Sequence, residues 1–306
     1  LCCYLVGYFL NNYKKQPFIP AIQKTSTLVL LSIISIVCFL ISFNTKTIDI
    51  SLSYVEKVEA AHLMEKAMKV LKESRMEHGV FIDIENDPNE TGLVGSPFSL
   101  ITTDEGDLDA KLTTLDPNIS AMLVDLMTQI NLQKNDTVAI LMTGSMPGAN
   151  IAALTACKAL GIVPITITSI GASQWGANQV DFTWLDMEAI LFNNDLIPSR
   201  SIAASIGGRN DMGRLLSPAG RKIITDNILF HGLPIIHKNK LAKNISKRME
   251  TFDSILPLKK YKAVINVGGG VGDTTHCYGG FGGGTAYGFT SCGQVSSTIL
   301  NLINRF

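Results

Sequence analysis

Near the N-terminus, hydrophobic residues follow one another without a single charge. Residues 27–43 read TLVLLSIISIVCFLISF and contain no charged residue, glycine or proline. A run of this length reaches the lower limit for a helix that spans the hydrocarbon core of a bilayer. No polar face recurs at helical spacing, which argues against a buried core helix. No small-residue cleavage pattern follows, which argues against a cleaved signal peptide. The pattern therefore predicts a transmembrane helix over residues 27–43.

Lysines indicate which side of this span faces the cytoplasm. Lys14, Lys15 and Lys24 precede the span, whereas the charges that follow it are mixed. Cytoplasmic flanks carry an excess of positive charge, so we expect residues 1–26 in the cytoplasm and the bulk of the chain outside the cell membrane. The opening LCCYLVGYFL is also apolar and is a candidate stub of an earlier span, which would leave this orientation unchanged. The protein is thus expected to be integral to the membrane, with one or two spans.

A second helical pattern follows the span. Residues 54–77 are strong helix formers without glycine or proline, and apolar residues recur among them at roughly helical spacing. His78 and Gly79 close the segment. We interpret residues 54–78 as a stalk helix that carries the chain from the membrane to a domain.

That domain is predicted to cover residues 79–272. Residues 86–117 are rich in turn formers and indicate loops. Apolar strand patterns then cover residues 137–142, 162–168, 200–205, 233–236 and 262–267. Helical patterns cover residues 118–131, 147–160, 182–192, 217–231 and 241–252. Such alternation predicts an α/β fold, namely a Rossmann-like, mostly parallel sheet with helices on both faces. The glycine-rich residues 273–306 lack periodicity and are an uncertain tail.

Charge and cysteine content exclude several classes of protein. Lys and Arg number 26, as do Asp and Glu, so a basic face for nucleic acid is not expected. Six cysteines form no CxxC pair or metal-ligand spacing, so we expect no metal and no cofactor. An oxidising compartment would allow one disulfide among Cys157, Cys277 and Cys292. Cys157, inside a predicted helix, fits a small core residue better.

Candidate ligand residues follow the strands, because ligands of doubly wound sheets bind beyond the carboxyl ends of the strands. The first such turn holds Thr143, Gly144, Ser145 and Asn150, with Pro147 at the start of a helix. Free backbone N–H groups at a helix start favour an anion. A serine N-cap in a tight turn explains the pattern equally well. The turn lacks both the phosphate-binding GxxxxGK[ST] motif and the GxSxG nucleophile elbow.

The second candidate turn holds Ser169, Ser173, Trp175 and Asn178. Loop tryptophans with small neighbours often line binding clefts. Packing of Trp175 over the sheet edge is the alternative. In either case this turn is expected beside the first one, since their strands are consecutive.

The remaining candidates follow the later strands and comprise Arg209, Asn266, Gly268 and Gly269. The Arg209 guanidinium would suit a carboxylate or phosphate. The glycines would permit positive φ or a close backbone approach. Convergence of all four turns on one cleft would make a ligand site.

A catalytic triad can be drawn in the chain order of α/β-hydrolases. Its members would be Ser145, either Asp186 or Asp211, and His237. A chain of this length offers such a combination by chance, so Ser145 is a candidate nucleophile without a secure base.

Several longer strings carry a family resemblance. They are SYVEKVEAAHLMEKAM, TGLVGSPFSLITTDEGDLDAKLTTLDPN, TGSMPGANIAAL, ITSIGASQWGAN, FTWLDME, SIAASIGGRNDMGRLLSPAGR and VINVGGG. Together they resemble the poly-γ-glutamate system protein family, found beside bacterial poly-γ-glutamate synthesis and export components. The resemblance runs from about residue 54 to residue 271. It implies an N-terminal anchor and a role with the polymer, but no particular reaction.

Three hypotheses follow. The first is a membrane-anchored accessory protein of poly-γ-glutamate capsule biosynthesis or export, whose partners are the other components and whose cleft binds glutamate carboxylates through Ser145 and Arg209. The second is an extracytoplasmic serine-type hydrolase or transferase of γ-glutamyl amides. The third is a phosphosugar-binding module. It rests on a fold-level likeness to sugar-isomerase-type domains at Ser145, Lys158 and Gly161, and it requires a cytoplasmic domain. Whether the protein is an enzyme stays open at this point.

Overall fold

The computed structural model describes residues 24–45, 50–79, 81–268 and 285–289. The chain divides into two compact units, Leu1–Ser51 and Leu52–Phe306. The expectations for residues 1–23 and for a disulfide that involves Cys277 or Cys292 lie outside the described residues. Cys157 is described: it is a buried free thiol whose pKa burial raises to about 12, which agrees with a small core residue.

The first unit contains one long apolar helix, α2 (Thr25–Asn44), which extends the predicted span at both ends. It carries no charged side chain, and its twenty residues rise about 30 Å, the thickness of a bilayer core. None of its side chains is buried, as expected of a helix that contacts lipid. Helix α2 is therefore long and apolar enough to cross a membrane.

The second unit is built on a parallel sheet with the strand order β6-β5-β2-β1-β7-β8. The strands are β1 (Thr137–Thr143), β2 (Val163–Ser169), β5 (Ala203–Ser205), β6 (Ile235–Ile236), β7 (Ala263–Val267) and β8 (Thr285–Phe289). All neighbouring strands pair in parallel. Strand β8 lies within residues 273–306, where the sequence shows no periodicity that predicts an element. A short antiparallel ribbon, β3 (Asn178–Gln179) with β4 (Phe182–Thr183), accompanies the sheet.

Helices connect the strands as the alternation predicts. They are α6 (Pro147–Leu160), α7 (Trp184–Asn193), α8 (Pro218–Phe230) and α9 (Leu241–Ile255). Alternate residues of β1 face opposite cores: Ile140 packs in the cluster that contains α6, and Leu141 packs in the cluster that contains α9. Both faces of the sheet are therefore covered by helices, and the Rossmann-like prediction is confirmed.

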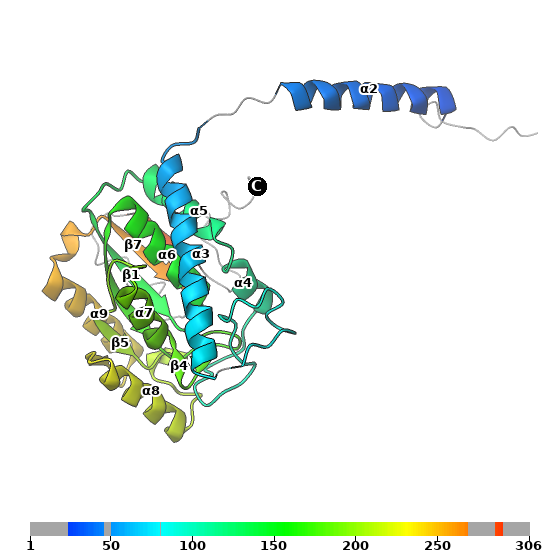
Figure 1. Ribbon diagram of the computed structural model, residues 1–306. Coiled ribbons are helices and arrows are strands. Elements are labelled where there is room, and N and C mark those ends of the chain that lie inside the picture. The colour runs from blue at the N-terminus through cyan, green and yellow to red at the C-terminus, as the bar shows by residue number, and fades with distance from the viewer. Residues whose placement is uncertain (1–23, 46–49, 80, 269–284, 290–306) are drawn as a thin grey trace, which may run out of the picture. The chain divides into compact units, whose positions relative to one another are not determined.

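The helix predicted as a stalk belongs to the domain. Helix α3 (Tyr54–Glu77) packs on α5 (Asn118–Gln129) and α6, as Figure 1 shows. Its Met64 and Leu71 are fully buried in the main core. The stalk interpretation is therefore wrong, and the compact unit begins at Leu52 rather than at residue 79. Its apolar residues recur at helical spacing because they form the face that packs in the core.

A short helix interrupts the segment expected to be loop. Helix α4 (Leu108–Thr113) is capped by Asp107, whose carboxylate accepts a hydrogen bond from Ala110 N at 3.0 Å. Its position matters because it carries a lysine to the carboxyl edge of the sheet.

Candidate functional site

The carboxyl edge of the sheet contains the point where the strand order reverses. The chain leaves β1 for β2 on one side and later returns through α9 to β7 on the other side of β1. In such sheets the crevice outside the strand ends at this point is the usual ligand site. The turns after β1, β2 and β7 all begin at this edge.

The turns after β1 and β2 are joined by hydrogen bonds. Gly144 N donates to Ser169 O at 2.8 Å, and Ser173 N donates to Ser145 Oγ at 2.9 Å. A Cβ on residue 144 would lie 2.3 Å from the carbonyl oxygen of Ile170, so this approach requires glycine. The structure thus brings together the predicted residues of these two turns.

A segment from the region before α4 is laid along the second turn. Thr103 N donates to Ala172 O at 2.8 Å, and Gln174 N donates to Asp104 O at 3.1 Å. These backbone bonds extend the sheet edge and fix where α4 begins. They explain how a residue distant in sequence reaches the two turns.

That residue is Lys111 of α4, which sequence reasoning did not identify. Its Nζ donates to the carbonyl oxygen of Ser145 at 2.5 Å and lies 2.8 Å from Ser173 Oγ. The side chain is only 4% exposed. Burial lowers the pKa of Lys111 from its ordinary value to about 8, although the charge of Asp107 opposes this shift. Within the described ranges, no carboxylate forms an ion pair with this ammonium group.

Two candidates of the second turn serve the loops themselves. Both polar atoms of the Asn178 side chain are engaged with Ser96, through Ser96 N at 2.9 Å and Ser96 O at 2.7 Å. Trp175 adopts a positive φ of 56° and packs against the main core. The Trp175 side chain therefore packs against the protein, which is the alternative to lining a cleft. The Asn178 side-chain amide is used by hydrogen bonds within the protein.

Two asparagines flank the reversal point. Asn150 Nδ2 donates to Thr143 O at 2.8 Å, and Asn266 Nδ2 lies 3.5 Å from Gly268 O. Both side chains are fully buried, and their Oδ1 atoms have no hydrogen-bond partner in the part of the chain that the structure describes. A Cβ on residue 268 would lie 2.6 Å from the methyl group of Thr143, which keeps the turn after β7 close to β1. Gly269 lies outside the described residues.

The predicted Arg209 is exposed in a 3-10 turn (Arg209–Asp211), and the structure shows no hydrogen bond from its side chain to a described residue. A different arginine, Arg248 of α9, reaches the strand ends. One of its guanidinium nitrogens lies 2.8 Å from Ser169 Oγ, 2.7 Å from Ser205 Oγ and 2.9 Å from an oxygen of the Asp211 carboxylate, so its two N–H groups are shared among three acceptors. The assignment of an anion-binding role to Arg209 receives no support from this geometry.

The triad drawn from the sequence is not assembled. Asp186 accepts from His231 Nε2 at 2.7 Å, and its pKa stays below its ordinary value because hydrogen bonds from His231 and Thr183 outweigh burial. Asp211 pairs with Arg248, and His237 is exposed. Neither aspartate therefore orients His237, and this hypothesis is wrong.

The residues of the phosphosugar analogy lie at the two ends of one helix. Lys158, near the C-terminal end of α6, forms an ion pair with Asp195 at 2.6 Å. Ser145 precedes the other end of the same helix, about 20 Å away by helix rise. The analogy therefore stays at the level of the fold.

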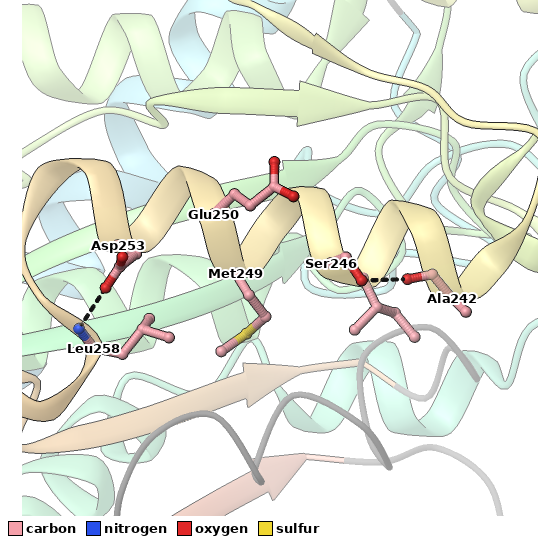
Figure 2. A pocket seen from close by; sticks show the side chains of 7 residues that line it. Ala242, Ser246, Met249, Glu250, Asp253 and Leu258 are labelled. Carbon is pink, nitrogen blue, oxygen red and sulfur yellow. Dashed lines mark hydrogen bonds between the residues drawn. The ribbon is translucent and has the colours of Figure 1, made fainter.

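An open groove of about 510 Å³ runs along α9, and no predicted site residue lines it. Its lining residues include the carboxylates of Glu250 and Asp253 and the side chain of Met249, all on α9 (Figure 2). Acidic side chains at the rim disfavour an anionic ligand. The groove shares no lining residue with the cluster around Lys111.

The site that geometry supports is the Lys111 cluster, which consists of Lys111, Ser145 and Ser173. It combines a buried cation with two partly exposed hydroxyl groups at the start of α6. Comparisons of the chain with protein-family models, with curated proteins and with solved structures find no match.

Proposed function

We propose that this protein is a membrane-anchored accessory protein of bacterial poly-γ-glutamate capsule synthesis or export, whose α/β domain binds the polymer through the Lys111 cluster. The identity of the polymer is inferred from the family resemblance, and α2 is the proposed membrane anchor. In a γ-linked glutamate chain each residue keeps a free α-carboxylate, so the ligand is a regularly spaced polyanion. Such a ligand needs a cation that is not already neutralised by the protein.

Lys111 is the observation that carries this proposal. Its ammonium is buried, has no ion-pair partner among the described residues, and lies 2.8 Å from the Ser173 hydroxyl group, so its charge is available to a ligand bound there. The start of α6 adds the positive end of a helix dipole at Ser145. A carboxylate held there accepts from hydroxyl groups and offsets the buried charge.

We expect Lys111→Met to weaken the binding of poly-γ-glutamate about tenfold or more, because charge-assisted hydrogen bonds contribute about 1.5–3 kcal/mol. The measurement is isothermal titration of the full-length protein in detergent with purified polymer. Lys158→Met is the matched control, since Lys158 is a surface lysine paired with Asp195. Equal affinity of the Lys111 variant and the wild type would remove the cluster from the binding site.

The domain is proposed to lie on the outer face of the membrane, as the lysines before the span indicate. A cysteine in place of the exposed Asp181, in a chain whose other cysteines are replaced, is expected to react with a membrane-impermeant alkylating probe in intact cells. Reaction only after lysis would place the domain in the cytoplasm and contradict the proposal that it meets exported polymer.

A further inference from the structure

We propose that Ser173 is a nucleophile activated by Lys111 as general base, and that the pair transfers or hydrolyses γ-glutamyl acyl groups. The substrate class rests on the function proposed above, whereas the nucleophile and base rest on geometry alone. The sequence pointed to Ser145 as the candidate nucleophile with His237 as its base, and the structure does not bring these two together.

The two side chains come from distant parts of the chain. Lys111 belongs to α4 and Ser173 to the turn after β2, and Nζ lies 2.8 Å from Oγ. This distance is within the range expected for a nucleophile and its base. Ser173 is partly exposed, so an acyl group can reach the hydroxyl, whereas Lys111 is buried, which lowers the pKa of its amine.

A third group orients the base. The carbonyl oxygen of Ser145 can only accept, so at 2.5 Å it binds one N–H of Lys111. In the neutral amine the lone pair is then available for the proton of the Ser173 hydroxyl. The lowered pKa of about 8 means that a useful fraction of Lys111 is neutral just above neutral pH.

Ser145 differs from Ser173 in its surroundings. Its Oγ accepts from Ser173 N at 2.9 Å, and no titratable group of the described residues is hydrogen-bonded to this hydroxyl. Ser145 therefore positions the turn that carries the nucleophile. Within the described ranges, the Ser145 hydroxyl donates no hydrogen bond to another residue. Its proton is therefore available to the oxygen of an acyl group bound at this turn.

The reaction balances without a cofactor. Ser173 Oγ forms a bond to the γ-carbonyl carbon while its proton passes to Lys111 Nζ. The C–N bond then breaks, and the leaving amine takes the proton from Lys111. Water, deprotonated by Lys111, cleaves the acyl-serine to a γ-carboxylic acid and restores the serine. An amine in place of water would form a new amide instead.

A fluorophosphonate probe on the full-length protein in detergent tests this inference. We expect Ser173 to be the labelled residue, located by peptide mass spectrometry, and the labelling rate to rise with pH with a midpoint near pH 8, as Lys111 loses its proton. Ser173→Ala should abolish labelling, and Lys111→Met should slow it about a hundredfold or more. Ser145→Ala should be labelled more slowly than the wild type, because Ser145 positions this turn, but the labelled residue should still be Ser173.

Other outcomes have distinct meanings. Labelling that persists in Ser173→Ala, or a wild-type rate that does not depend on pH, overturns the inference. Absence of labelling from a wild-type protein that still binds poly-γ-glutamate refutes the chemistry and leaves the proposed function standing. Loss of both labelling and binding refutes both. If Lys111→Met does not fold, Ser173→Cys replaces it: its alkylation by iodoacetamide should be faster than that of Ser145→Cys, and equal rates count against the pair.

Discussion

Replacement of Arg248 by methionine is expected to lower the free energy of unfolding by about 3–5 kcal/mol, the usual effect of removing one partner of a buried ion pair. Arg248 is 2% exposed and Asp211 is 6% exposed. The variant leaves the Asp211 carboxylate buried without its cation, and it removes a donor from Ser169 and from Ser205. Urea unfolding of the full-length protein in detergent measures the change.

Two further variants separate this effect from a general loss of charge. Lys222→Met breaks the exposed pair with Asp226 and is expected to change stability by less than about 0.5 kcal/mol. Adding Asp211→Asn to Arg248→Met should recover part of the loss, because the unpaired charge disappears. Strict additivity of the two substitutions would show that Arg248 acts through packing rather than through the ion pair.

The second large effect is a dependence of stability on alkaline pH. Folding lowers the pKa of Lys111 from its ordinary 10.5 to about 8. Between these values the unfolded chain holds a proton that the folded chain has released, so stability rises with pH across this window. The full gain is about 3 kcal/mol, from about 1.4 kcal/mol for each pKa unit.

The measurement compares unfolding of the wild type and of Lys111→Met at about pH 7.5 and about pH 10. The difference between the two proteins should move in favour of the wild type as pH rises. Lys158→Met, which keeps Lys111, should behave like the wild type. A difference that stays constant, or moves the other way, would mean that Lys111 does not lose its proton more easily in the folded protein.

Local pattern was sufficient for most of the fold. The strands of the main sheet from β1 to β7 and the helices α5 to α9 occur close to where apolar periodicity predicts them, because period 2 and period 3.6 reflect the burial of one face of each segment. The short ribbon of β3 and β4 was not predicted, and β4 occupies residues 182–183, which were assigned to the start of a helix. The same signal in residues 54–77 was assigned to a stalk, although it records the face of α3 that packs on α5 and α6. Helix α4 was missed because six residues hold too few turns to show a period.

Within the site, the pattern of strands and helices predicted where the turns lie but not which side chains from elsewhere in the chain contact them. Thr143 ends β1, and Ser145 and Ser173 lie in the turns after β1 and β2, so their place at the carboxyl edge follows from topology. Arg209 also follows a strand, yet its side chain is exposed, and Arg248 from the middle of a helix reaches the strand ends instead. Nothing in the local pattern around Arg248 distinguishes it from the other cations of α9 except its position on the buried face.

The sequence by itself determined the long apolar helix, the order of strands and helices and the α/β class, since each depends on hydrophobic burial within one segment. Only the tertiary structure decided which polar groups meet. Lys111 and Ser173 are 62 residues apart, and their contact depends on how the segment before α4 lies along the turn after β2. Such contacts depend on the register between neighbouring segments and on the close approach of the backbone at Gly144. Neither produces a periodic pattern of apolar residues in the sequence.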